Sequence, residues 1–133
     1  MSTGDYLRYL RAVKGGPTPF EIEQATGVPS SVYRQMEQRY RAVGTDDELA
    51  KLADYFGVPV EDLTQRQEWT RKALSAALVE SSEEERPIRL ELRNGASFSG
   101  RVIWSDLGST LLEQDNGREV VVQRHMIDRW ELL

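Results

Sequence analysis

The spacing of apolar residues changes from a helical period to strict alternation near Pro87, and this change constrains the fold more than any other feature. Before it, apolar side chains recur at three- and four-residue intervals, which favours amphipathic helices. After it, Ile88, Leu90 and Leu92 alternate with charged residues, which favours half-buried strands. We therefore predict an α+β protein of two domains with a linking segment. The predicted segments are residues 1–65, 66–86 and 87–133.

Start and stop signals divide residues 1–65 into five expected helices. Thr18-Pro19-Phe20-Glu21 has the form of a capping box with proline at the first helical position. Gly27-Val28-Pro29 predicts a tight turn, and Thr45 an N-cap. The helices are expected from Asp5 to Val13, from Pro19 to about Thr26, from about Ser30 to Gln38, from Thr45 through Phe56, and as a short turn within 57–63.

The middle segment, 66–86, is predicted to form an amphipathic helix followed by an acidic linker. Thr64-Gln65-Arg66-Gln67 has capping-box form, which predicts the start of a helix. The residues of its apolar stripe are Trp69, Ala73, Leu74, Ala77 and Leu78. The helix either serves only as a linker or buries its apolar stripe against another surface, and we favour the second because the stripe needs burial.

The last segment, 87–133, contains five expected short strands separated by turn signals. Asn94-Gly95 is a strong hairpin signal because both residues tolerate positive φ. Gly100 lies inside the second strand and suits a sharp bend. Five short strands in so little sequence favour a small β-barrel.

The helices of the first segment carry a family resemblance. Gly27-Val28-Pro29, a third helix ending in Met36-Glu37, and the closing Phe56–Leu63 run resemble the lambda-repressor/Cro helix-turn-helix family. The resemblance implies that the third helix enters the major groove of DNA. It also implies which residues contact DNA. The bases would be contacted by Ser30, Ser31, Arg34 and Gln35, and the phosphates would be contacted by Arg39 and Arg41.

This segment also departs from the family pattern. Glu23 stands where the second helix usually has a small residue, and Pro29 where the third helix usually has a polar cap. The sequence from Ala25 to Pro29 is more similar to the RodZ-like branch of the family, whose helix-turn-helix is associated with protein contact. A protein partner is therefore an alternative to DNA.

The strands of the last segment resemble the bacterial Sm-like protein family typified by Hfq. The matching sequence segments are Ile88 to Gly95, Phe98 to Val102, and Val120 to Ile127. The resemblance implies a homo-oligomeric ring, expected as a hexamer, although the sequence itself leaves the number of subunits open. It also implies an interface between the fourth strand and the fifth strand of a neighbour, in which the contacting residues are Val120, Val121, Val122, Gln123, Arg129, Trp130 and Leu132.

The same resemblance implies a pore in which Arg124 and His125 contact RNA. Other RNA-binding positions of the family are replaced here. The pair that stacks on bases is Leu107-Gly108, the first strand has Glu91 in place of an aromatic residue, and an expected basic rim is the acidic run 83–85. Because Gly108 has no ring on which a base could stack, we expect RNA binding to be weakened.

Charge and residue types narrow the function classes. Residues 1–65 hold seven Lys or Arg against ten Asp or Glu, and the whole chain carries a net charge of −5. Without cysteine, with one histidine and without a phosphate-binding loop, we expect no enzyme activity, no cofactor and no metal site. We also expect a cytoplasmic protein without a membrane contact. The expected function is regulation through helix-turn-helix heads on a ring-forming domain. The alternatives are an RNA-binding ring and a protein-interaction scaffold.

Overall fold

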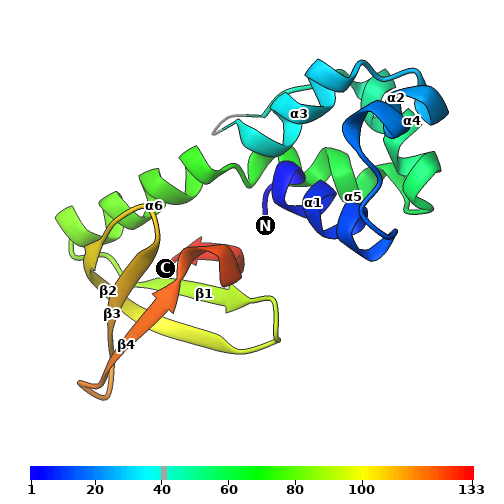
Figure 1. The fold of residues 1–133 in the computed structure, drawn as a ribbon. Coiled ribbons are helices and arrows are strands. Elements are labelled where there is room, and N and C mark those ends of the chain that lie inside the picture. The colour runs from blue at the N-terminus through cyan, green and yellow to red at the C-terminus, as the bar shows by residue number, and fades with distance from the viewer. Residues whose placement is uncertain (40–41) are drawn as a thin grey trace. The chain divides into compact units, whose positions relative to one another are not determined.

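Helices occupy the first part of the chain and an antiparallel sheet the last part, so the protein is α+β as predicted (Figure 1). The computed structural model describes residues 1–39 and 42–133. Arg41, a predicted phosphate contact, lies outside the described residues. Contacts group the chain into a helical unit, Ser2–Arg71, and a sheet unit, which consists of Lys72–Leu133 and Met1.

The helical unit contains the five helices predicted before residue 65, followed by a short 3-10 turn. Their bounds are α1 Thr3–Val13, α2 Pro19–Thr26, α3 Ser30–Gln38, α4 Asp46–Phe56, α5 Val60–Thr64 and η1 Gln65–Glu68. Their apolar faces meet in one core, as the helical spacing predicts. The buried members of that core are Leu7, Leu10, Ile22, Val28, Tyr33, Met36, Leu49, Leu52, Ala53 and Leu63.

Side-chain caps start the helices at two of the predicted positions. The Thr18 hydroxyl accepts a hydrogen bond from the Glu21 amide at 3.1 Å, at the start of α2. At the start of α4, Thr45 and Glu48 form the reciprocal capping box, in which each side chain accepts from the other residue's backbone N–H. These caps satisfy helix N–H groups that have no partner within the helix, so local sequence decides where α2 and α4 begin.

The predicted helix start at Thr64 is wrong. Thr64 still has helical backbone angles, because it is the last residue of α5. An N-cap needs an extended backbone, so Thr64 cannot cap a new helix. The chain instead passes through η1, leaves helical geometry at Trp69, and starts α6 at Arg71.

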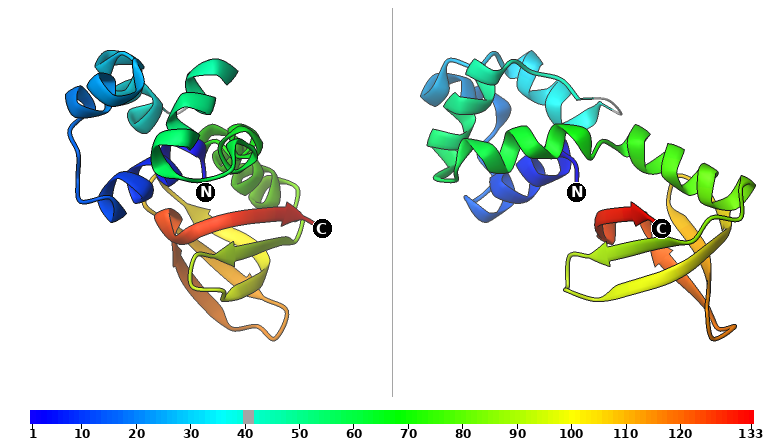
Figure 2. Two further views of the ribbon diagram at one scale, coloured as in Figure 1. Left: turned by 90° about the vertical axis from the view of Figure 1, so that its right-hand side faces the viewer. Right: turned by 180° about the vertical axis from the view of Figure 1, so that it is seen from behind.

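Helix α6, Arg71–Glu83, belongs to the sheet unit from Lys72 onward, and five antiparallel strands follow it. The strands are β1 Ile88–Leu92, β2 Ser97–Ser105, β3 Ser109–Gln114, β4 Glu119–Gln123 and β5 Ile127–Leu132, with the 3-10 turn η2 Arg124–Met126 before the last. Their order is β4-β3-β2-β1-β5, so β5 lies beside β1 (Figure 2). Within this order β4 and β5 are the two edges, each with one strand neighbour among the described residues. The five predicted strands are therefore confirmed, while the pairing within the chain is that of an open sheet.

One helix and one face of the sheet form the core of this unit. Leu74, Ala77 and Leu78 of α6 pack with the buried residues of the strands, which are Ile88, Leu90, Val102, Leu112, Val122 and Ile127. The stripe predicted to need burial is thus buried against the sheet over these three positions. Ser81, fully buried near the end of α6, accepts from the Val102 amide at 3.2 Å and donates to the Arg86 carbonyl at 2.6 Å.

Candidate nucleic-acid interface

Helix α3 divides its side chains between the core and solvent. Tyr33, Met36 and Glu37 are buried, whereas Arg34 and Gln35 are exposed on the other side of the helix. Because residues three and four apart lie on one helix face, the exposed Ser31 belongs with the Arg34 and Gln35 side chains. Ser30, also predicted to face DNA, is half-buried. The exposed side therefore carries hydroxyl, guanidinium and amide groups, which are the groups that hydrogen-bond base edges.

The two described cations of this interface are both accessible. Among residues 1–39 and 42–133, Arg34 forms no ion pair, and it lies exposed near the middle of α3. Arg39, exposed as well, is the residue at which α3 ends, and its amide donates to the Gln35 carbonyl at 2.9 Å. Arg34 and Arg39 are thus available to an incoming ligand, as the sequence resemblance requires.

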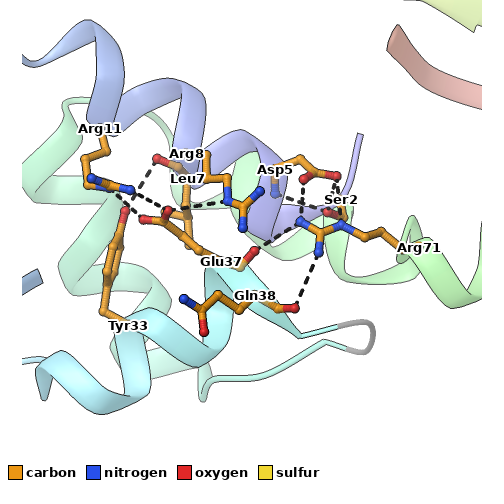
Figure 3. Close-up of polar contacts among 9 residues, drawn as sticks. All are labelled: Ser2, Asp5, Leu7, Arg8, Arg11, Tyr33, Glu37, Gln38 and Arg71. Atoms are coloured by element: carbon orange, nitrogen blue, oxygen red, sulfur yellow. Dashed lines mark hydrogen bonds and ion pairs between the residues drawn. The ribbon is translucent and has the colours of Figure 1, made fainter. Parts of the chain in front are cut away.

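An ion pair between the half-buried Arg11 and the buried Glu37 fixes α3 against α1 (Figure 3). Arg11 donates from Nε and Nη2 to the two carboxylate oxygens of Glu37, at 2.8 and 2.9 Å, while Nε of Arg8 lies 3.6 Å from the same carboxylate. The hydrogen bond to Glu37 raises the pKa of the Arg11 guanidinium. Burial raises the pKa of the Tyr33 phenol well above its ordinary value, and Glu37 adds to this rise. A bidentate ion pair of this kind fixes the rotation of α3 about its own axis as well as its position.

Arg71 holds the C-terminal end of the same helix. Its Nη2 donates to the Glu37 carbonyl at 3.0 Å and to the Asp5 carboxylate at 2.6 Å, and its Nη1 donates to the Gln38 carbonyl at 3.4 Å (Figure 3). A cation at this end also interacts favourably with the helix dipole. No local sequence pattern indicates this role, because Arg71 follows α3 by more than thirty residues.

The N-terminal end of α3 is held by Glu23, one of the two departures from the family pattern. Pro29 stands at the cap position and forms no side-chain cap bond. Instead, Oε1 of Glu23 in α2 accepts a hydrogen bond from the Ser30 amide at 2.7 Å. The two departures therefore compensate, since the carboxylate of Glu23 replaces the cap that proline cannot supply.

The two residues predicted for the pore, Arg124 and His125, differ in their exposure. Arg124 donates from Nη1 to the Asp106 carbonyl at 2.9 Å and from Nη2 to the Ser75 hydroxyl at 2.7 Å, so its guanidinium joins the β2–β3 loop to α6. His125 is exposed. The Asp106 carboxylate accepts from the Ser109 and Gly108 amides at 2.8 and 2.7 Å, and these bonds lower its pKa. Leu107 projects from this loop and is 84% exposed.

The edge strands carry the residues predicted for the subunit interface. On β4, Val121 is 60% exposed, whereas Val122 is buried and Val120 is half-buried. On β5, Arg129 is exposed, and Trp130 and Leu132 are half-buried. Val120, Trp130 and Leu132 all touch the core cluster of the sheet unit from its border. Gln123, the last interface residue, is exposed at the end of β4.

Neither metal-binding nor membrane-spanning features occur in the described part of the chain. Residues 1–39 and 42–133 contain no group of three or more potential metal ligands. In the same ranges, no helix combines the length and apolarity needed to cross a bilayer. Comparison with protein-family models and with curated protein sequences returned no match.

Proposed function

We propose that this protein binds duplex DNA through α3 and regulates by doing so as a homo-oligomer. The observation that carries the proposal is the exposed side of α3, with Ser31, Arg34 and Gln35 on it. Arginine can bind guanine and glutamine can bind adenine through paired hydrogen bonds. Both ends of the helix are fixed, by Glu23 and Arg71, so these groups are presented on a rigid element.

The order of elements before α3 supports the same reading. Helix α2 ends at Gly27, which adopts left-handed backbone angles, and α3 follows at Ser30. This short helix-turn-helix connection is the arrangement expected from the lambda-repressor/Cro resemblance. The assignment to that family belongs to the proposal.

The sheet unit is proposed to join subunits into an Sm-like ring. Support comes from the strand order, which leaves β4 and β5 as the two edges. The resemblance implies pairing of these edges between neighbouring chains, and Val120 and Val122 would then lie near Trp130 and Leu132 of the next copy. An exposed apolar edge otherwise favours uncontrolled association. Several linked heads would also bind DNA more tightly than one acidic head alone.

A protein partner is the second candidate, and Glu23 favours it. Its carboxylate lies at the start of α3, where a helix-turn-helix protein approaches the negatively charged DNA backbone. RNA is the weaker alternative. Arg124 is already bonded to Asp106 and Ser75, and Leu107-Gly108 offers no ring on which a base could stack.

Selection from a random duplex library, followed by titration of the enriched sequence, tests the proposal. Arg34→Ala should weaken binding to the enriched site by about 1–3 kcal/mol and relax preference at one base pair. Arg34→Lys keeps the charge but loses the planar fork, so it should lose the base preference and retain the salt dependence. Arg39→Ala should weaken all sequences alike and reduce the salt slope.

Lys51→Ala is the matched control, because Lys51 is an exposed cation of α4 paired with Asp47 at 3.1 Å. It should leave the base preference unchanged. If no sequence is enriched at low salt and Arg34→Ala has no effect, DNA is not the ligand of α3, and the protein-contact candidate takes its place.

A further inference from the structure

Glu23 places a built-in anion at the start of α3. The amide groups in the first turn of a helix have no helical partner, and together with the helix dipole they form a site that attracts anions. Here the Ser30 amide already donates to Oε1 of Glu23 at 2.7 Å. A backbone phosphate is therefore excluded from the position that it would otherwise favour.

The same carboxylate has unused hydrogen-bonding capacity. Among residues 1–39 and 42–133, its Oε2 has no hydrogen-bond or ion-pair partner, and the Glu23 side chain is half-buried. A carboxylate only accepts hydrogen bonds, so its next partner must be a donor. Ser30, to which it is bonded, and Ser31 belong to the first turn of α3, and Arg34 lies one turn further along the helix.

We infer that Glu23 determines base selectivity, accepting a hydrogen bond from the exocyclic amino group of cytosine in the major groove. This inference rests on the proposed function, since it concerns the DNA face of α3. Cytosine presents an amino donor there with no acceptor of its own beside it, whereas adenine presents its amino group next to the N7 acceptor, guanine two acceptors, and thymine an acceptor and a methyl group. Acceptors facing the carboxylate would be repelled. Glu23 and Arg34 would thus read complementary features, an amino group at the start of α3 and guanine one turn later.

The test uses the full chain and a random duplex library, with wild type, Glu23→Gln and Glu21→Gln. Glu23→Gln keeps an oxygen that can accept from the Ser30 amide, so its melting temperature should stay within a few degrees of wild type. Its side-chain amide also donates, so a preference of about fivefold to tenfold for cytosine should fall close to none. Glu21→Gln removes one charge from the exposed first turn of the same helix. It should raise the affinity for duplex DNA of any sequence as much as Glu23→Gln does, because each variant loses one negative charge, but it should retain the preference for cytosine.

The outcomes separate the inference from the proposed function. Enriched duplexes whose base preference is the same for wild type and Glu23→Gln overturn the inference alone. Loss of the preference in Glu21→Gln as well would show a general effect of charge and would also overturn it. If none of the three proteins binds duplex at low salt, both the inference and the DNA-binding proposal fail. Glu23 would then suit a cationic side chain on a protein partner.

Discussion

At the scale of single residues, the helical unit depends on one buried carboxylate. Glu37 is 4% exposed, and Arg11 holds both of its oxygens. A buried charge that loses its partner is costly, because the lost solvation is no longer offset. The position of α3, and with it the proposed DNA face, should therefore be sensitive to Arg11.

Arg11→Ala should lower the free energy of unfolding by about 2–3 kcal/mol. This is below the about 3–5 kcal/mol typical of a broken buried pair, because the Arg11 side chain is 32% exposed and Arg8 remains near Glu37. Urea unfolding followed by helical circular dichroism measures the change. Lys51→Ala, which breaks the exposed pair with Asp47, should cost less than about 1 kcal/mol. Equal losses in the two variants would contradict the burial argument.

Tyr33 gives the helical unit a dependence on alkaline pH. Its phenol is fully buried and its pKa is raised in the folded state, so folding favours the neutral form. The stabilisation is complete below the unfolded pKa of about 10 and decreases as the pH rises above it. Above that pH, the slope contributed by Tyr33 is about 1.4 kcal/mol for each pH unit.

Tyr33→Phe should remove this contribution to the slope. Unfolding free energies measured at about pH 9 and about pH 11 should fall less for Tyr33→Phe than for wild type, by roughly 1 kcal/mol. Tyr9→Phe is the control, because Tyr9 is 51% exposed and should leave the alkaline loss unchanged. An alkaline loss of stability in Tyr33→Phe as large as in wild type would show that Tyr33 is not its source.

At the scale of elements, the pairing of β2 with β3 depends on Gly100. A Cβ atom on Gly100 would overlap the Glu113 carbonyl oxygen of the paired strand, so no larger residue fits without a backbone shift. The register between these strands also shifts between Val102 and Trp104. A bulge at this point increases the local twist of the sheet.

Gly100→Ala should therefore destabilise the sheet unit by about 3 kcal/mol or more, at the upper end of the costs of overpacking. Gly108→Ala is a matched control, because the nearest atom to its Cβ would be Oδ1 of Asp106 at 3.6 Å, an ordinary contact distance. Thermal unfolding monitored by tryptophan fluorescence reports on Trp104 and Trp130 of this unit. Similar melting temperatures for the two variants would show that the strand can move to accept the methyl group.

At the scale of the whole molecule, the two edges of the sheet, β4 and β5, are the surfaces through which the proposal joins copies. Each edge strand has one strand neighbour among the described residues, and β4 adds the exposed Val121. Such edges are templates for pairing with another chain. The proposed ring would use both edges of every subunit and leave none free.

Sedimentation of the full chain should give an oligomer, whose mass is a multiple of 15.2 kDa. Val121→Pro removes a backbone donor from β4 and should shift the protein towards monomer. Val121→Thr keeps the donor and the β-branched shape, so it should assemble as wild type does. Circular dichroism checks that the proline variant remains folded. A folded wild-type monomer at micromolar concentration would contradict the assembly proposal, and so would a Val121→Pro variant that stays folded and keeps the wild-type oligomeric mass.

The sequence by itself determined the elements, because their signals are local. Thr18 and Thr45 cap the helices that follow them, Gly27 ends α2, and alternation after Pro87 defines β1. The exposed side of α3 could also be predicted, since a helical period separates Arg34 and Gln35 from the buried Tyr33. The prediction was wrong where two signals competed, at Thr64, because a residue that ends one helix cannot also cap the next.

Only the tertiary structure decided which side chains hold the site in place. Glu23 of α2 accepts a hydrogen bond at the start of α3, and Arg71, the first residue of α6, donates one at the end of α3. The Arg124 guanidinium donates to Asp106 and Ser75. Such contacts depend on where the elements lie in space, and their partners follow no fixed spacing along the chain. In the sequence, Glu23 and Pro29 are two separate departures from a pattern. In the folded protein, Glu23 supplies the cap that Pro29 lacks. A backbone amide left without a partner at a helix end would cost free energy, and the Glu23 carboxylate removes that cost.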